Sequence, residues 1–94
     1  MTARETAERH AQDVVDANFE RLVSDIEPET LTAMLGAGVM PPNPTTEWSI
    51  LSETNDGENV KFHVRYANDT ESLELETTWA KRGDDWKIVD ATKL

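Results

Sequence analysis

"KFHVRYANDTESLELE", residues 61–76, contains two alternating runs of apolar and charged residues with a turn-forming Asn-Asp pair between them. Phe62 and Val64 alternate with basic side chains before the turn, and Leu73 and Leu75 alternate with acidic ones after it. A period of two is typical of a β-strand that buries one face. The stretch therefore predicts an antiparallel hairpin with one apolar face and one charged face.

Two more alternating runs flank this hairpin and extend it. Trp48 and Ile50 alternate with polar residues before a turn signal at 55–57, and Trp86 and Ile88 alternate with them after a turn signal at Gly83. Strands joined by tight turns pair with their neighbours in the sequence. Residues 46–94 therefore predict a four-stranded antiparallel β-meander.

The turns also predict which residues lie opposite one another. We take two-residue turns at 68–69 and 83–84 and a three-residue turn at 55–57. The resulting pairs are Trp48–Val64, Ile50–Phe62, Val64–Leu73, Phe62–Leu75, Trp79–Ile88 and Lys81–Trp86. All three turns place apolar residues on the same face of the sheet, and a slip of one residue would break that agreement.

The first third of the chain has a helical period instead. Thr2 and Glu5 have the spacing of an N-terminal capping box. Apolar residues then recur three and four positions apart, at Ala7, Ala11, Val14, Val15, Phe19, Leu22, Val23 and Ile26. This spacing predicts one long amphipathic helix. Its outer surface is expected to carry the i,i+4 ion pairs Glu5–Arg9, Arg9–Asp13 and Arg21–Asp25.

A second, short helix and an extended crossing complete the chain between helix and sheet. Pro28 is favourable in the first turn of a helix, and Gly36 favours its end, so residues 2–38 form the helical part. Three prolines within residues 40–46 exclude regular structure there. Because one helical face and one sheet face must both be covered, we predict a single α+β domain, 1–94, with the helices packed on the meander.

The ending "TTWAKRGDDWKIVDATKL", residues 77–94, carries a resemblance when it is read with this order of elements. It resembles the small bacterial or archaeal members of the nuclear-transport-factor-like (cystatin-like) superfamily, over essentially the whole chain. The resemblance implies a curved meander around a long helix, and a homodimer formed through the open face of the sheet. Isomerases, dehydratases, cyclases, ligand-binding domains and accessory domains share this fold, so the resemblance does not select a function.

The composition narrows the classes of partner. The formal charge is −10, from nineteen acidic and nine basic residues, and a field of that sign repels nucleic-acid backbones. The acidity serves either solubility or binding to a basic protein. There is no cysteine, no secretory signal and no apolar run of transmembrane length, so we expect a cytoplasmic protein that does not bind membranes. His10 and His63 have no metal-ligand spacing around them, and we expect neither a metal nor a cofactor.

The apolar face of the sheet is one candidate site. Trp48, Tyr66 and Trp79 either form the core or line a cavity for a small apolar ligand between helices and sheet. Asp90 has the same parity as these aromatics, and a carboxylate on an apolar face could act as a general base. The alternative is that Asp90 lies in water near the end of the last strand.

The charged face is the other candidate. The predicted register places His63 opposite Glu74 and Lys61 opposite Glu76, with Arg65 diagonal to Glu74. Such a face is either solvated and neutralised by its own pairs, or it forms a homodimer interface with a second copy. We expect the dimer and a non-enzymatic role; the competing hypothesis is a small-ligand-binding protein or an isomerase-like or cyclase-like enzyme.

Overall fold

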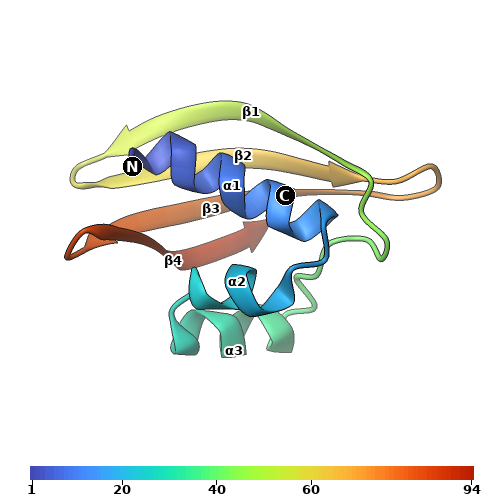
Figure 1. Cartoon of the computed structure of the whole chain (residues 1–94), viewed down its shortest axis with the longest axis horizontal. Helices are drawn as coiled ribbons and strands as arrows, with labels where there is room; N and C mark the ends of the chain where they lie inside the picture. The colour runs from blue at the N-terminus through green and yellow to red at the C-terminus, as the bar shows by residue number, and fades with distance from the viewer.

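Four antiparallel strands form one sheet, and three helices precede them in the chain (Figure 1). The computed structural model describes residues 1–94. Its elements are α1 (Ala3–Val15), α2 (Phe19–Ser24), α3 (Pro28–Gly36), β1 (Glu47–Asp56), β2 (Asn59–Ala67), β3 (Ser72–Arg82) and β4 (Asp85–Lys93). The strand order is β1-β2-β3-β4, which confirms the predicted α+β class and the meander. None of the helices is both long and apolar enough to span a membrane.

Helix α1 crosses one face of the sheet and closes the core (Figure 1). Its capping box forms as predicted, because Glu5 N donates to Thr2 Oγ1 at 3.1 Å and Thr2 N donates to Glu5 Oε1 at 2.9 Å. The buried apolar residues of this helix are all small, Ala3, Ala7 and Ala11. Because these residues are small, the helix can approach the sheet closely. The largest side chains of the core come from the strands.

The prediction of a single long helix is wrong, because the structure has two helices, α1 and α2, separated by a turn. Ala17 has a φ of +57°, and Asn18 N donates to Asp13 O at 2.9 Å. The break turns the chain toward β4, where Ile88 N donates to Asp25 O at 2.7 Å. The apolar spacing continues unchanged through the break, which is why the sequence does not reveal it.

Helix α3 and the crossing follow the prediction. Pro28 occupies the first turn of α3, and the helix ends at Gly36. Thr30 Oγ1 donates to Val89 O at 3.0 Å, and α2 and α3 lie beside the β4 edge of the sheet rather than over its centre (Figure 1). No regular element occupies residues 37–46. The two short helices thus form a second, peripheral layer.

Two of the three predicted registers are shifted by two residues. Trp79 pairs with Ile88 as predicted, but Trp48 pairs with Tyr66 and Val64 pairs with Leu75. The first hairpin closes at Gly57–Glu58 and takes up a residue in a bulge at Leu51. In the second, the side chain of Asn68 accepts from Thr70 N and Glu71 N at 2.9 and 2.8 Å, which widens the turn. A shift of two keeps the paired side chains of residues 47–50 and of the second hairpin on their predicted faces, whereas the bulge at Leu51 reverses the alternation of residues 52–56.

A bulge in β4 changes the position of Asp90. Ile88 pairs with Trp79, and the next pair is Asp90 with Thr78, so that Val89 is the extra residue. An extra residue reverses the alternation of the strand beyond it. Asp90 is therefore paired with a residue of the charged face and is exposed, and our prediction that it shares a face with Trp79 is wrong.

Candidate functional site

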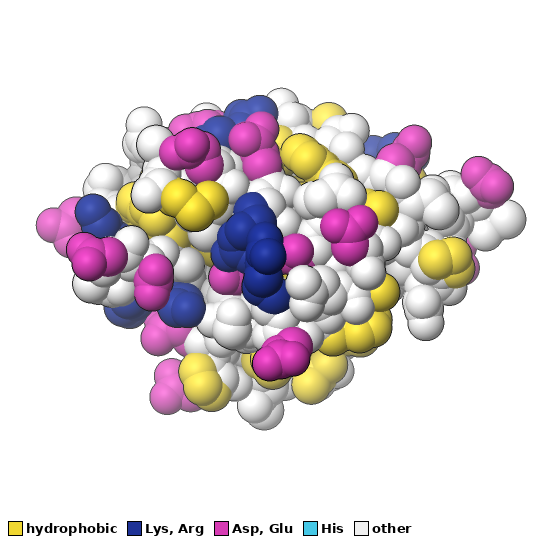
Figure 2. All heavy atoms as spheres, in the orientation of Figure 1, with side chains coloured by type: hydrophobic (Ala, Val, Ile, Leu, Met, Phe, Trp, Pro, Cys, Tyr) yellow, Lys and Arg dark blue, Asp and Glu magenta, His cyan; other side chains and the backbone are white.

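An apolar groove of about 370 Å³ lies between the helices and the proline-rich crossing. None of its lining residues carries a charge, and the helical part of the wall consists of Val14, Val15, Phe19, Leu22, Leu31 and Met34. The far wall comes from Val39, Met40, Pro41, Pro42 and Pro44. Figure 2 shows hydrophobic side chains gathered at the surface over α2 and α3. A concave surface of this size and composition is typical of a site for an apolar ligand.

The rim of the groove holds large apolar side chains that the fold leaves in water. Phe19 is 63% exposed, Met40 58% and Leu35 55%. Neither α2 nor α3 has a buried residue, although both carry the apolar spacing of an amphipathic helix. Full burial of one such side chain contributes roughly 1.5–3 kcal/mol. A ligand that covers this rim therefore gains binding energy that the folded chain does not use itself.

The crossing forms a preformed wall. Thr45 Oγ1 donates to Pro42 O at 2.5 Å, and Asn68 Nδ2, from the second hairpin, donates to Pro44 O at 2.7 Å. These bonds tie the loop to itself and to the sheet. Asn43 also lines the groove, and its amide group can both donate and accept a hydrogen bond. The groove thus combines an apolar body with two polar side chains, Asn43 and Thr45.

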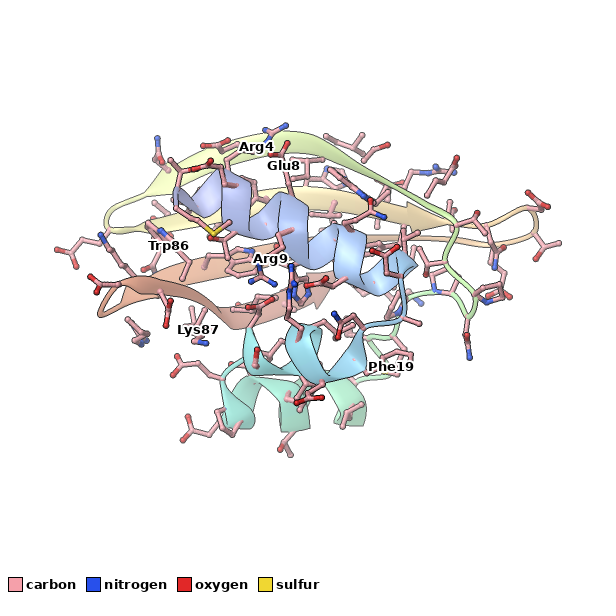
Figure 3. The ribbon with its side chains drawn as sticks, in the orientation of Figure 1. Arg4, Glu8, Arg9, Phe19, Trp86 and Lys87 are labelled. Carbon is pink, nitrogen blue, oxygen red and sulfur yellow. The ribbon has the colours of Figure 1, made fainter.

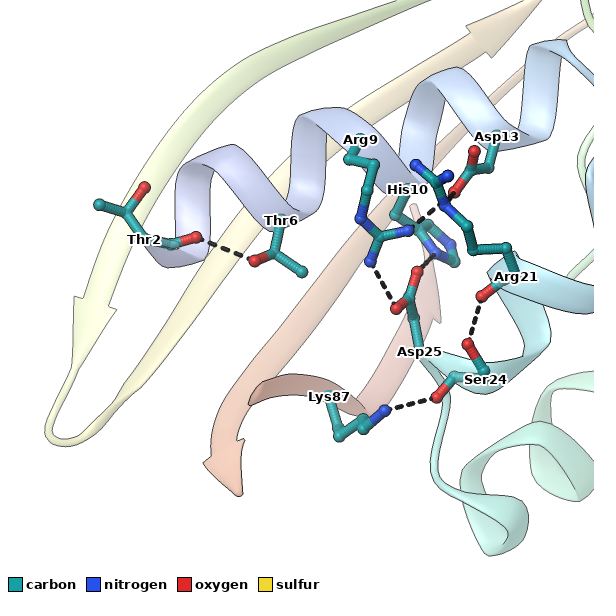
Figure 4. A network of polar contacts seen from close by, with 9 residues as sticks. All are labelled: Thr2, Thr6, Arg9, His10, Asp13, Arg21, Ser24, Asp25 and Lys87. Carbon is teal, nitrogen blue, oxygen red and sulfur yellow. Dashed lines mark hydrogen bonds and ion pairs between the residues drawn. The ribbon is translucent and has the colours of Figure 1, made fainter. Parts of the chain in front are cut away.

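A cluster of five charged or titratable side chains fixes α2 against α1 (Figure 4). Arg9 donates to Asp13 at 2.8 Å and to Asp25 at 2.6 Å, His10 Nδ1 lies 2.9 Å from Asp25 Oδ2, and Arg21 Nε donates to Asp13 at 3.0 Å. Lys87 Nζ adds a bond to Ser24 O at 2.7 Å. The contacts join α1, α2 and β4.

Burial and charge compete at Asp25. Burial would raise its pKa, but the hydrogen bonds from His10 and Arg9 outweigh burial and hold the pKa of Asp25 below its usual value. An ionised carboxylate only accepts hydrogen bonds, so Nδ1 of His10 carries a proton. The ring of His10 also packs edge-on against Trp79 at 5.5 Å between centroids. Both buried carboxylates are occupied by cations, so the cluster acts as an anchor for α2.

The sequence reveals this cluster only in part. The Arg9–Asp13 pair is confirmed, but the Glu5–Arg9 pair is not formed and Arg21 binds Asp13 instead of Asp25. Asp13 and Asp25 are also buried rather than on an exposed surface. The break at Ala17 is the reason, because it folds α2 back toward α1. The spacing of charges along a straight helix cannot contain that information.

The four residues predicted for a ligand cavity do not line the groove. Trp79 and Tyr66 are buried in the core between α1 and the sheet, and burial raises the pKa of Tyr66. Trp48 is half-buried, and its Nε1 donates to Gln12 Oε1 at 3.0 Å. Asp90 lies on the surface at the bulge of β4. The groove residues of α1 and α2 belong to the apolar stripe predicted from the sequence, which gives no signal that they stay uncovered, and those of the crossing were predicted only to be extended chain.

The five residues of the charged face lie together on β2 and β3, on the side of the sheet away from α1. His63 Nε2 is 2.6 Å from Glu74 Oε1, and Lys61 Nζ is 3.8 Å from Glu76 Oε1. The predicted pairing of this face is wrong, because the shifted register makes both contacts diagonal and places Arg65, rather than His63, directly opposite Glu74. Arg65 reaches Glu47 on β1 at 3.4 Å. Lys61, His63 and Arg65 each therefore have a carboxylate partner within the chain.

A scan against protein-family models, a search of curated proteins and a search of solved structures each return no match to this chain. Its function therefore has to be inferred from the groove, the ion cluster and the charged face themselves.

Proposed function

We propose that this protein binds a small apolar molecule in the groove between α1, α2, α3 and the proline-rich crossing. The observation that carries the proposal is an uncharged hollow of about 370 Å³ whose rim leaves Phe19, Leu35 and Met40 largely exposed. Such a volume lies within the roughly 300–1,000 Å³ range of ligand pockets. No group with the geometry of a general acid and base lines it, so the proposed role is binding rather than catalysis.

Two leucines of similar exposure provide a matched test. Leu35 lines the groove and is 55% exposed, whereas Leu51 lies in the bulge of β1 and is 51% exposed. Calorimetric titration with 1-naphthalenemethanol, a neutral probe, should give saturable binding to the unmodified protein. Leu35→Arg should weaken it at least about tenfold, since a charge would enter an apolar wall. Leu51→Arg should bind as well as the unmodified protein. Equal effects of the two substitutions, or no saturable binding, would overturn the proposal.

A second candidate function is homodimer formation through the charged face. Its support is the segregation of sign: Lys61 and Arg65 lie on β2, and Glu74 and Glu76 lie on β3. A two-fold axis parallel to the strands and between β2 and β3 would lay the cations of one copy over the anions of the other. The same face can equally be neutralised by its internal pairs, so the dimer stays a prediction.

The dimer predicts a concentration-dependent mass. Light scattering should give twice the chain mass at high concentration and the chain mass on dilution. Lys61→Glu should favour the monomer, because it places like charges opposite each other, and Lys61→Glu with Glu76→Lys should restore the dimer. A single chain mass at all concentrations would exclude this function and leave the groove proposal untouched.

The finer family assignment is also a proposal. The order of three helices followed by a four-stranded meander supports membership of the cystatin-like superfamily. Within that superfamily, ligand binding without catalysis is among the known roles, and it agrees with the groove. The cytoplasmic location is a further prediction from the sequence.

A further inference from the structure

We infer that the molecule held in the groove carries a positive charge next to its apolar body, as an aryl or alkyl ammonium ion does. This inference rests on the proposed function and specifies the class of ligand. It draws on the charges beside the groove, on the exposed ring of Phe19 and on the net charge of the chain.

Most charged residues in the segment that lines the groove are acidic. Residues 14–45 supply the whole lining and contain one arginine, Arg21, and five carboxylates, of which Asp25 and Glu27 are paired with Arg9 and Arg82. Arg21 is engaged by Asp13 at 3.0 Å on the side of the ion cluster. No free cation is therefore left in this segment to receive the head group of an anionic ligand.

Two exposed carboxylates, which do not themselves line the groove, are next in the sequence to residues that do. Asp16 stands between Val15 and Ala17, which both line the groove, and Glu20 directly follows Phe19. Glu20 forms no ion pair within the chain, unlike Asp25, which is bound by Arg9. A cationic head group at this end of the groove would find carboxylates within the adjoining helical turn.

Phe19 supplies an aromatic face at the same end. Its side chain is 63% exposed and lies at the start of α2, on the other side of that helix from Lys87 (Figure 3). A cation over an exposed aromatic ring gains about 0.5–1 kcal/mol, which is roughly a two- to fivefold gain in affinity. An anion would instead meet the repulsion of a chain with a formal charge of −10.

Three probes of one shape test the inference. 1-Naphthylmethylammonium, 1-naphthalenemethanol and the anion 1-naphthaleneacetate share the naphthylmethyl group. They are positively charged, neutral and negatively charged, respectively. Titrated against the full chain at low salt, the ammonium should bind about two- to fivefold more tightly than the alcohol, and the acetate more weakly than either. At 0.5 M salt the three affinities should converge, since screening weakens exposed charges.

Single substitutions measure separately what the ring of Phe19 and the carboxylate of Glu20 contribute to binding of the ammonium. Phe19→Leu keeps an apolar side chain, so binding of the alcohol should persist while the advantage of the ammonium falls. Glu20→Gln should reduce the same advantage, and Glu58→Gln, in the turn between β1 and β2, should not. Thermal unfolding of each variant verifies that it is folded.

The outcomes distinguish this inference from the proposed function. If the alcohol and the ammonium bind equally, or if the ammonium's advantage ignores Phe19→Leu, Glu20→Gln and salt, the inference is overturned and the groove remains a binding site. If none of the three probes binds saturably, the proposed function fails with it.

Discussion

The apolar stripe predicted for residues 7–26 is divided between α1 and α2, and its two parts differ in burial. Along α1 as far as Ala11 the stripe is made of alanines, and Ala7 and Ala11 are buried against the sheet. Along α2 it is made of larger side chains, and Phe19 and Val23 are largely exposed beside the groove. The half with the smaller apolar residues is thus the one that closes the core.

The difference teaches that position relative to the sheet decides burial, and not the size of the apolar side chains. Helix α1 lies over the centre of the sheet, whereas α2 and α3 lie beside its β4 edge (Figure 1). At that edge the helices are held by ion pairs and by main-chain bonds such as Glu27 N to Ile88 O at 3.1 Å. Apolar surface that is not needed for folding remains available for binding.

The chain's two phenylalanines offer the largest test of this comparison. Phe62→Ala should lower the free energy of unfolding by about 3–5 kcal/mol, because Phe62 is fully buried and a cavity would remain. Phe19→Ala should change it by no more than about 0.5 kcal/mol, as for other exposed positions. Urea denaturation measures both. Similar costs for the two substitutions would mean that the α2 region is packed like the core.

Asp25→Asn tests the ionic anchor of α2. It leaves Arg9 and His10 without their shared anion and should cost about 3 kcal/mol at neutral pH, at the lower end for broken buried pairs. The exposed Asp69→Asn should cost less than about 0.5 kcal/mol. If Asp25→Asn costs no more than Asp69→Asn, the ion pairs do not hold α2.

The same substitution should change the pH dependence of stability. The folded pKa of Asp25 lies below its ordinary value of 3.8, so its contribution is complete above that pH and is lost as the pH falls through the folded pKa. Denaturation between pH 2 and 6 should therefore show a smaller acid loss for Asp25→Asn than for the unmodified protein. Parallel curves for the two proteins would contradict the lowered pKa.

Ala17→Gly should have the smallest effect and the opposite sign. Ala17, at the junction of the two halves, has a φ of +57°, which costs a residue with a Cβ about 1 kcal/mol and glycine almost nothing. We expect stabilisation of about 0.5–1 kcal/mol by thermal unfolding. Ala37→Gly is the control, since Ala37 has a φ of −91° and gains no such relief. A loss of stability at Ala17 would show that the turn is not strained.

The sequence predicts the layers of this fold well because they depend on periodicity. The meander, the end of α3 at Gly36 and the Trp79–Ile88 pair follow from local patterns. Exact registers depend on turn geometry, and the side chain of Asn68 widens one turn in a way that composition does not show. The bulge at Val89 likewise moves Asp90 without any local signal.

The candidate site was harder to predict, for a physical reason. A period of 3.6 identifies the faces of α2 and α3 that avoid water, but it does not say whether another element covers them. That depends on the turn at Ala17, whose positive φ is unusual for alanine and cannot be read from its neighbours. The same turn brings Asp25 back to Arg9 and so creates the ion cluster.

The most direct measurement is methyl chemical-shift mapping of the protein during titration with 1-naphthalenemethanol. Saturable shifts should appear at Leu22, Leu31 and Met34, which line the groove from α2 and α3. The methyl groups of Val64 and Leu75, in the core under α1, should change little. Shifts confined to the core methyls, or shifts that never saturate, would contradict a preformed groove that binds apolar molecules.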